Sequence, residues 1–357
     1  MAGTEFALND PLAVQRWSQS LSKYAEKASY FSKFIGEGES IIVAKKELSK
    51  GAGDKITMGL RAKLSMPGVV GDNLIKDTSA EEALQFFSDA IFIDQYRKST
   101  KSKGKMSEQR VPYNMRREGR DALAVFFGEL YDEMMMIYLS GARGVNEGFI
   151  NPVDWTGFAN NSIQAPDAAH QMYAGTATAK ANLTSADTFS IATIEALREK
   201  TKMMRPKMTP AKVNGGNKFV LLLSPMQARQ LRSASSSNDW IDIRKSTDGQ
   251  DSPLYNGSLG EYAGFILHEH ENVIQFNDYG SGSDLAAARA LCLGVQAGLI
   301  AWGQDSGQGR YSWNEESDDR GNALAITAGA IFGVKKARYN AKDFGVIAID
   351  SYIPQNL

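Results

Sequence analysis

The sequence has little of what disulfide-rich, secreted or membrane proteins need. One cysteine among 357 residues rules out an internal disulfide, which fits a reducing cytosol. The N-terminus lacks the basic segment and apolar run of a signal peptide. The longest apolar stretches, Ala290–Trp302 and Ala325–Val334, fall short of the roughly 18–20 residues that span a bilayer. These absences predict a soluble protein that is made in a cytoplasm and has no membrane partner.

The sequence also lacks a net charge of either sign. Forty basic residues stand against 41 acidic ones, a balance that argues against a dedicated nucleic-acid binder. Charge is concentrated locally, since residues 97–120 contain nine basic and two acidic residues. This basic segment is interpreted either as a solvated loop or as a contact with an acidic patch on a neighbour or with packaged nucleic acid. One acidic candidate is a predicted polar loop with Glu315, Glu316, Asp318 and Asp319.

Catalytic motifs are absent as well. No phosphate-binding glycine loop, nucleophile elbow or H-E-x-x-H zinc pattern occurs. His268 and His270 share one face of a predicted strand, which is interpreted as solvated because a metal site needs a third ligand. Cys292 lies in the apolar run ALCLG and is expected to be a buried hydrophobic residue. We therefore expect no enzyme activity and no metal or other cofactor.

An apolar stripe is present in residues 10–35. Asp10 and Pro11 are typical of a helix start, and apolar residues then recur every three or four positions. Such a helix packs either on the core of its own chain or on a neighbouring subunit, and the sequence leaves both open. The stripe consists of Trp17, Leu21, Tyr24, Ala28, Phe31 and Ile35.

Residues 54–98 form a predicted β-arm. The segment DKITMGLRAKL at 54–64 alternates apolar and polar residues, as in a strand with one buried face. A turn follows, then a predicted short helix at Ser79–Phe87 and a second strand in DAIFIDQYRKS. A hairpin alone is marginal in water, so the chain's own body or another subunit must cover its apolar face. The polar face of the first strand and the turn include Arg61, Lys63, Gly68 and Gly71.

The strongest helical pattern runs from about Glu118 to Gly141. Its apolar residues form a broad face over roughly 35 Å. Residues 145–189 are polar and irregular. Together with the remaining elements, this predicts a mixed α+β fold. Those elements are helices at Ser190–Met203 and Met226–Arg232 and strands at Lys218–Leu223, Ala325–Lys335 and Gly345–Tyr352.

Several segments, in order, resemble one protein family. They are FSKFIGEGESII, KGAGDKITMGLRAKLSMPGVVGDN, EEALQFFSDAIFIDQYRKS and the terminal GAIFGVKKARYNAKDFGVIAIDSY. The sequence resembles the major capsid proteins of N-four-like podophages and their relatives, which have the Hong Kong 97-type shell fold. The resemblance covers most of the chain.

The resemblance implies a division of the chain into the parts of that fold. It implies an N-terminal arm at 1–53, an extended hairpin called the E-loop at 54–98, and a peripheral domain at 99–204 with a spine helix at 118–141. It further implies a mainly axial domain at 205–324 and return strands of the peripheral domain at 325–357.

The resemblance also implies partners and a location. Copies of the chain would form the hexamers and pentamers of an icosahedral shell in the virion, after synthesis in the host bacterial cytoplasm. A separate scaffolding protein, a portal and decoration proteins would assemble with it, and packaged double-stranded DNA would touch it weakly and non-specifically. The candidate intersubunit residues are Trp17, Leu21, Tyr24, Phe31, Arg61, Lys63, Gly68, Gly71, Arg97, Lys98, Arg116 and Arg117.

Two alternatives belong to other functional classes. One is an oligomeric metal-dependent enzyme that uses His268 and His270. The other is a nanocompartment shell of the same fold, which would package protein cargo instead of DNA.

The predicted arm yields a direct test. Deleting Met66–Asp72 should leave a folded subunit that assembles poorly, because only the predicted turn region of the hairpin is lost. Circular dichroism and electron microscopy of the purified protein check the two parts of this expectation. Normal shells from the deletion variant would show that the arm is not an assembly element.

Overall fold

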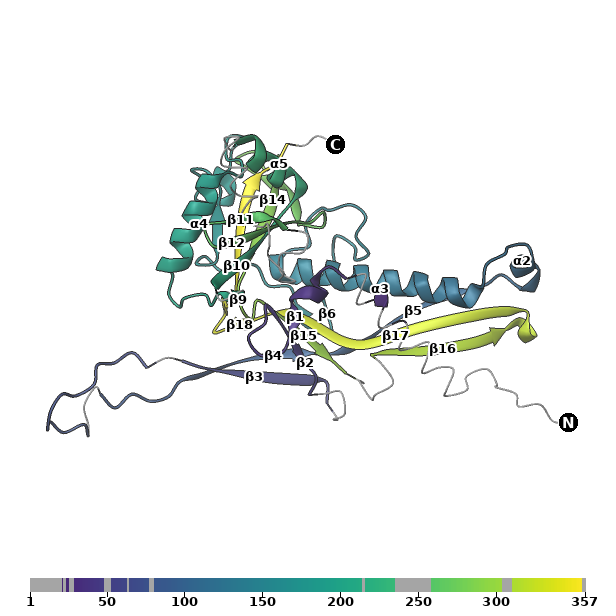
Figure 1. Cartoon of the computed structure of the whole chain (residues 1–357), viewed down its shortest axis with the longest axis horizontal. Coiled ribbons are helices and arrows are strands. Elements are labelled where there is room, and N and C mark those ends of the chain that lie inside the picture. The colour runs from purple at the N-terminus through teal and green to yellow at the C-terminus, as the bar shows by residue number, and fades with distance from the viewer. Residues whose placement is uncertain are drawn as a thin grey trace.

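The computed structural model describes residues 21, 24–25, 29–47, 53–62, 64–76, 80–213, 216–234, 258–303 and 310–354. The chain is elongated and has three parts (Figure 1). An upright module carries α4 and α5, a lateral module carries the long helix α3 above a sheet, and a thin arm formed by β3 and β4 projects to the opposite side. Within the described residues, no helix is long and apolar enough to cross a membrane.

Helix α3, Met115–Ser140, confirms the predicted long helix and begins three residues earlier than expected. Asn114 caps its start, since the Asn114 side chain accepts the N–H groups of Arg116 and Arg117 at 3.1 and 3.3 Å. Gly141 closes it in the left-handed conformation, with φ of 72°. A Cβ atom at Gly141 would lie 2.2 Å from the carbonyl oxygen of Gln164, so the close approach also requires glycine.

A six-stranded sheet lies along α3. Its path runs β1, β2, β15, β17, β16, and β5 also pairs with the 14-residue β17. Apolar side chains of α3, β15 and β17 share the largest core of the chain. The strands are β1 (Ile35–Gly36), β2 (Ile42–Lys45), β5 (Asp94–Lys101), β15 (Gly298–Trp302), β16 (Tyr311–Asp318) and β17 (Ala323–Lys336).

The prediction of a polar loop for the acidic segment is wrong, because Glu315, Glu316 and Asp318 belong to the strand β16. Tyr311, Trp313 and Glu315 are buried, and Ser312 and Asn314 between them are exposed, which is the two-residue period of a strand. The density of acidic residues hid this alternation in the sequence.

An eight-stranded sheet forms the upright module. Its path runs β11, β12, β10, β14, β20, β8, with β13 added on β14 and β9 on β10. Helices α4 (Ile191–Met203) and α5 (Pro225–Ala234), both predicted within one or two residues, contribute apolar side chains to a second core with this sheet. The strands are β8 (Gln171–Tyr173), β9 (Ala211–Val213), β10 (Gly216–Leu223), β11 (Ser258–Tyr262), β12 (Phe265–Glu269), β13 (Gln275–Tyr279), β14 (Leu285–Leu293) and β20 (Val346–Tyr352).

The C-terminal strands do not form one group, contrary to expectation. β17 lies in the sheet along α3, whereas β20 pairs with β14 and β8 in the eight-stranded sheet. α4, expected with the spine helix, likewise packs in the upright module. The reason for the position of β20 is that it is buried along almost its whole length and carries Asp350, whose charge is matched by Arg289 on β14.

The arm is a two-stranded hairpin of β3 (Lys55–Arg61) and β4 (Phe86–Phe92). The predicted helix at Ser79–Phe87 is wrong, since residues 80–85 are not helical and β4 begins at Phe86. The remaining short elements are α2 (Lys105–Gln109), β6 (Gly157–Phe158), β7 (Asn161–Ser162), β18 (Arg338–Tyr339), β19 (Lys342–Asp343) and the 3-10 turns Phe31–Phe34, Lys180–Asn182 and Asp319–Gly321.

Two neighbouring buried carboxylates on α3 hold separate segments of the chain. Asp132 accepts the N–H groups of Tyr30 and Phe31 at 2.5 and 3.0 Å and the Ser29 hydroxyl at 2.7 Å. Burial raises the pKa of Asp132, and the hydrogen bonds from Phe31, Ser29 and Tyr30 oppose this rise. Glu133 accepts the N–H groups of residues 150 and 151 at 2.5 and 2.7 Å. The N-terminal segment and the loop after α3 are thereby fixed to the same turn of the helix.

A buried arginine joins the two modules. Arg289 on β14 donates to both carboxylate oxygens of Asp350 on β20 at 2.7 and 2.8 Å. The same guanidinium donates to the carbonyl oxygen of Ser140, the last residue of α3, at 2.9 Å. A helix C-terminus has unpaired carbonyl groups and favours a cation, so Arg289 links the eight-stranded sheet to the end of the spine helix.

Replacing Asp132 tests whether its carboxylate fixes the N-terminal segment to α3. Asp132→Leu keeps a similar shape but leaves two backbone N–H groups without their acceptor, which should lower the free energy of unfolding by about 2–5 kcal/mol. Urea unfolding of the unassembled subunit measures this loss. The matched change Glu129→Leu, at an exposed position of α3, should cost at most about 0.5 kcal/mol. Equal losses in both variants would contradict an anchoring role.

Candidate assembly surfaces

The base of the arm is buried against the body of the chain. Ile56 and Met58 of β3 and Ile91 of β4 are at most 9% exposed. They share a small core with residues of β2 and β15 and with Ala337. The predicted apolar face of β3 therefore exists, and the chain itself covers its first half. The cover then ends, because Leu60 is half-buried and Leu64 is 54% exposed.

Polar contacts fix the direction of the arm at this base. Asp89 of β4 forms an ion pair with Lys335 of β17 and accepts the N–H of Arg338 at 3.1 Å. Lys335 also donates to the carbonyl oxygen of Ala90 at 2.9 Å. The Asp89 side chain is only 9% exposed, so its carboxylate depends on these partners.

Asn161 provides a second attachment where β4 leads into β5. The Asn161 side chain accepts the N–H of Phe92 at 3.0 Å and donates to the carbonyl oxygen of Phe92 at 2.8 Å. It thus occupies the place of a neighbouring strand at the point where the chain leaves the hairpin. From Asp94 onward, the predicted second strand of the arm pairs with β17 instead.

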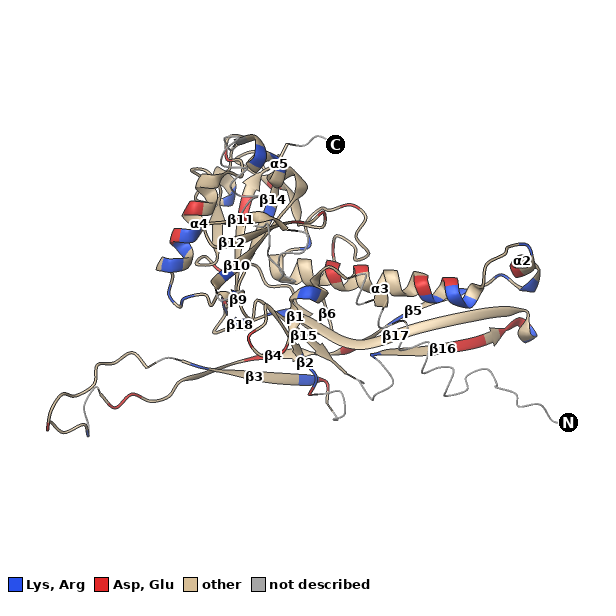
Figure 2. Cartoon of the chain, viewed as in Figure 1, with Lys and Arg blue, Asp and Glu red and all other residues tan. Residues whose placement is uncertain are grey.

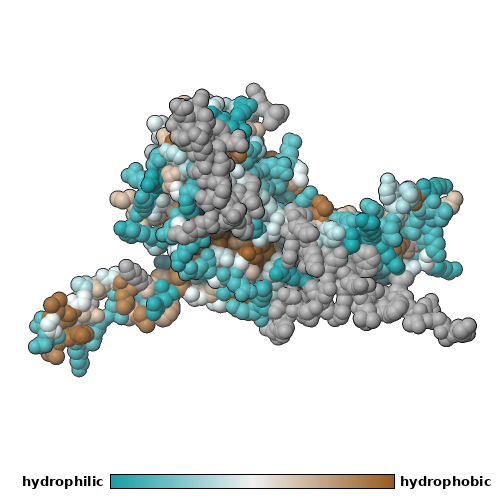
Figure 3. Space-filling model, in the orientation of Figure 1, coloured by the Kyte–Doolittle hydropathy of each residue, from teal (hydrophilic) through white to brown (hydrophobic). Residues whose placement is uncertain are grey.

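The far part of the arm exposes apolar side chains. Seven of the fifteen large hydrophobic residues that are exposed in the described part of the chain lie between positions 64 and 86, which concentrates them on this one element. Figure 3 shows brown side chains gathered along the arm. Exposed apolar patches of this kind mark sites of association. The seven residues are Leu64, Met66, Val70, Leu74, Ile75, Leu84 and Phe86.

A carboxylate holds the two limbs of the arm together beyond the paired strands. Glu82 accepts the N–H groups of Ser65 and Met66 at 2.7 and 2.9 Å. These backbone hydrogen bonds, led by that from Met66, lower the pKa of Glu82. Gly71 forms the turn at the end with φ of 72°, as its predicted turn position requires, whereas Gly68 has no positive φ.

The basic segment 97–120 meets acidic residues of its own chain. The Nε atom of Arg116 lies 2.9 Å from a carboxylate oxygen of Glu315, and Lys101 forms an ion pair with Asp318. Figure 2 shows blue and red segments at the start of α3 lying above the red segment of β16. The sequence left open a solvated segment or an acidic partner on a neighbour, and for these two pairs the acidic partner lies in the same chain. Arg97, Lys98 and Arg117 remain exposed.

The N-terminal stripe divides into buried and exposed residues. Leu21 and Phe31 are at most 1% exposed and belong to the core around α3. They are therefore wrong as contact candidates for a neighbouring subunit, because their own chain already covers them. Tyr24 is 48% exposed, and its ring lies 4.8 Å from the Arg120 guanidinium. Trp17 and Lys63 lie outside the described residues.

The prediction that His268 and His270 lie on a solvated strand face is wrong. His268 is completely buried, and the ring of His270 lies 4.4 Å from that of Tyr30. Burial, assisted by the charge of Lys33, lowers the pKa of His270 to about 4. Both imidazoles thus form packing contacts with the N-terminal segment. No group of three or more metal-ligating side chains occurs among the described residues.

Comparisons with known proteins agree with this architecture. A sequence profile of the family described as phage capsid protein matches residues 5–355. The chain belongs to the phage capsid protein family. This capsid protein is 40% identical to a chain of the capsid of Ralstonia phage GP4, with a TM-score of 0.86 and 100% of each chain covered. It is 28% identical to the major capsid protein of Pseudomonas phage KPP25, over 93% of each chain.

A more distant capsid shares the fold. A chain of the cyanophage Pam1 capsid is 21% identical over 92% of this chain and 93% of its own length, with a TM-score of 0.73. The predicted family and the Hong Kong 97-type α+β fold are confirmed.

The attachment at Asp89 can be tested in this capsid protein. Asp89→Ala removes the contacts to Lys335 and Arg338, so amide exchange in β3 and β4 should accelerate roughly tenfold while the exchange of α3 is unchanged. Hydrogen–deuterium exchange with peptide resolution measures both. Asp94→Ala is the control, since the exposed Asp94 carboxylate bonds only to the N–H of the next residue among the contacts described. Unchanged exchange in β3 and β4 would contradict the role of Asp89.

Proposed function

We propose that this chain is the major capsid protein of a tailed double-stranded DNA phage, and that its copies join through the uncovered end of the arm. The chain is a shell subunit, and its family and fold agree with this role. The observation that carries the arm's part is the contrast along the hairpin. Its base is buried and clamped, whereas residues 64–86 expose seven large apolar side chains.

The exposed end has a physical reason to seek a neighbour. Val70 and Leu74 are 84% and 83% exposed, and complete burial of such a side chain contributes roughly 1.5–3 kcal/mol. A two-stranded ribbon without cover is also marginal in water. Docking on a second subunit buries the exposed apolar side chains and covers the ribbon. Many such contacts together stabilise the shell. The contacts of Asp89 with Lys335 and Arg338 reduce the conformational entropy that the arm loses on docking, because they fix its direction beforehand.

The parts of the subunit are assigned as follows. The E-loop corresponds to the hairpin of β3 and β4, the peripheral domain to α3 with the six-stranded sheet, and the axial domain to the eight-stranded sheet with α4 and α5. Exposed candidates retained for intersubunit contact are Tyr24, Arg61, Gly68, Gly71, Arg97, Lys98 and Arg117, with Arg116 half-buried beside Glu315.

The assembly follows from closed symmetry. Hexamers and pentamers of the subunit close into an icosahedral shell in the virion, which prevents open-ended growth. A separate scaffolding protein, a portal and decoration proteins complete the particle, and the packaged DNA touches the shell weakly. Synthesis takes place in the host bacterial cytoplasm. The subunit acts as a structural protein and not as an enzyme.

Substituting the arm's apolar residues tests the proposal. The triple variant V70S, L74S and I75S should keep the thermal stability of the isolated subunit, because these side chains are exposed there. Its assembly should fall sharply, since each neighbour loses three apolar contacts. Negative-stain electron microscopy and sedimentation, with and without a candidate scaffold, measure assembly.

A matched variant provides the control. V145S, V153S and M203S alter three exposed apolar positions outside the arm, which are 38%, 65% and 72% exposed, and this variant should assemble normally. Normal shells from the arm variant would overturn the role of the arm. If the unaltered protein stayed monomeric under all these conditions, the shell function itself would be contradicted.

A further inference from the structure

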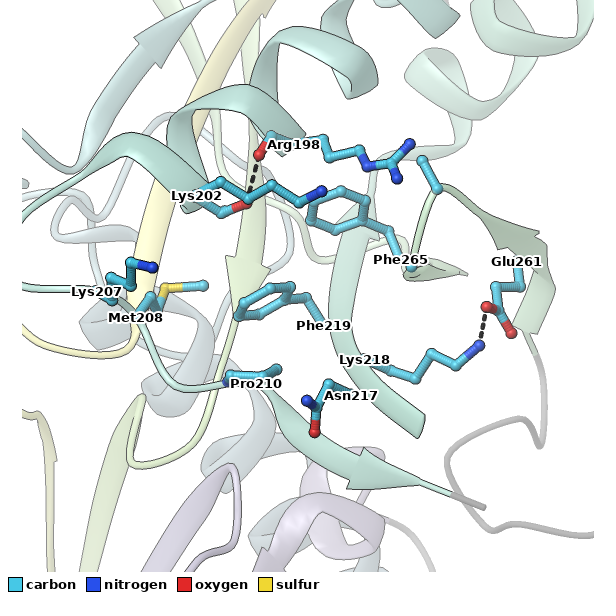
Figure 4. A pocket seen from close by; sticks show the side chains of 13 residues that line it. Arg198, Lys202, Lys207, Met208, Pro210, Asn217, Lys218, Phe219, Glu261 and Phe265 are labelled. Atoms are coloured by element: carbon cyan, nitrogen blue, oxygen red, sulfur yellow. Dashed lines mark hydrogen bonds and ion pairs between the residues drawn. The ribbon is translucent and has the colours of Figure 1, made fainter. Parts of the chain in front are cut away.

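A cationic pocket lies in the upright module, remote from the arm. Its volume is about 720 Å³, within the range of roughly 300–1,000 Å³ typical of ligand pockets. It lies between α4, the segment that follows α4, β10 and the turn between β11 and β12 (Figure 4). Nothing in the shell function described above uses this pocket.

The rim of the pocket is positively charged. Arg198 and Lys202 stand one turn apart on α4, and Lys207 follows the helix; all three are exposed. Within the described part of the chain, the Arg198 guanidinium has one loose ion pair, with the Glu195 carboxylate at 3.8 Å. The single carboxylate of the lining, Glu261, already pairs with Lys218. The rim therefore carries an excess of positive charge that an anionic ligand would neutralise.

The floor of the pocket is apolar. Phe219 is half-buried, and its ring stacks on that of Phe265 with 5.7 Å between centroids. Figure 4 shows Phe219 in the middle of the pocket, with Lys202 on one side and Pro210 on the other. Met208 completes this surface. Such a floor accepts an aromatic or large aliphatic side chain.

We infer that this pocket binds an acidic peptide segment of a partner protein, anchored by one apolar side chain. The spacing of the cations supports a peptide. Residues four apart on a helix have Cβ atoms about 5–6 Å apart, and alternate side chains of an extended peptide lie about 6.6 Å apart. Carboxylates at alternate positions can thus reach Arg198 and Lys202 in succession. The inference does not depend on the arm, so the two fail independently.

A single-stranded nucleic acid fits the pocket less well. Binding of successive bases relies on several exposed aromatic rings, each stacking on one base. Here Phe265 is only 1% exposed, so Phe219 alone offers a ring surface. A single compact anion, in turn, would leave the apolar floor empty.

Fluorescence anisotropy with defined probes tests the inference on the full-length, unassembled chain. The probe is a short labelled peptide with a central phenylalanine and glutamate at alternate positions. It should bind, and its affinity should fall with salt. Reversing two rim charges, K202E with K207E, should weaken binding roughly tenfold or more, the size expected when two screened contacts become repulsive. R229E, on the exposed face of α5 outside the pocket, should leave binding unchanged.

Three further measurements decide between ligand classes. A peptide with glycine in place of the phenylalanine should bind several-fold more weakly, and equal binding would overturn the apolar anchor. Displacement of the peptide by inorganic phosphate at matched ionic strength would identify a small-anion site instead. Tighter binding of a single-stranded oligonucleotide would assign the pocket to nucleic acid. Absence of binding by the peptide at low salt would overturn the inference, because the three rim cations and the apolar floor are all present in the isolated subunit.

Discussion

The complete burial of the second half of α3 is the constraint on which the rest of the structure depends. Every residue from Leu130 to Ser140 is buried, so other parts of the chain must surround the helix on all sides. Polar anchors fix these parts in place. Asp132 holds the N-terminal segment, Glu133 holds the loop after the helix, and the carbonyl group of Ser140 receives Arg289 from the eight-stranded sheet. The spine helix thereby determines how both modules are placed.

The subunit combines this rigid body with an arm that it completes only in part. Cover by the body ends between Leu60 and Leu64, and the apolar residues beyond that point face solvent in the single chain. The clamp at Asp89 and the side chain of Asn161 keep the arm extended. A subunit built in this way has a buried core of its own and retains exposed apolar surface on the arm, the kind of surface that favours association.

Local patterns predicted the elements that local physics controls. The period of apolar residues and Gly141 located α3, and the alternation in 54–64 located β3. The helix predicted at Ser79–Phe87 failed because two acidic residues resembled a helix start. Glu82 instead spans the arm to reach the N–H groups of Ser65 and Met66. The prediction at β16 failed for a related reason, since the two buried aromatic residues Tyr311 and Trp313 are followed only by polar and acidic residues.

The sequence by itself determined the α+β class, the long helix, the arm and, through its resemblance, the capsid family. Only the tertiary structure decided that Leu21 and Phe31 are buried in the core of their own chain. It also decided that β20 belongs to a different sheet from β17, and that His268 is buried and not solvated. The physical reason is sequence distance. Propensity and periodicity act over a few residues, whereas burial and ion pairing, such as Asp89 with Lys335, depend on segments that the chain brings together from far apart.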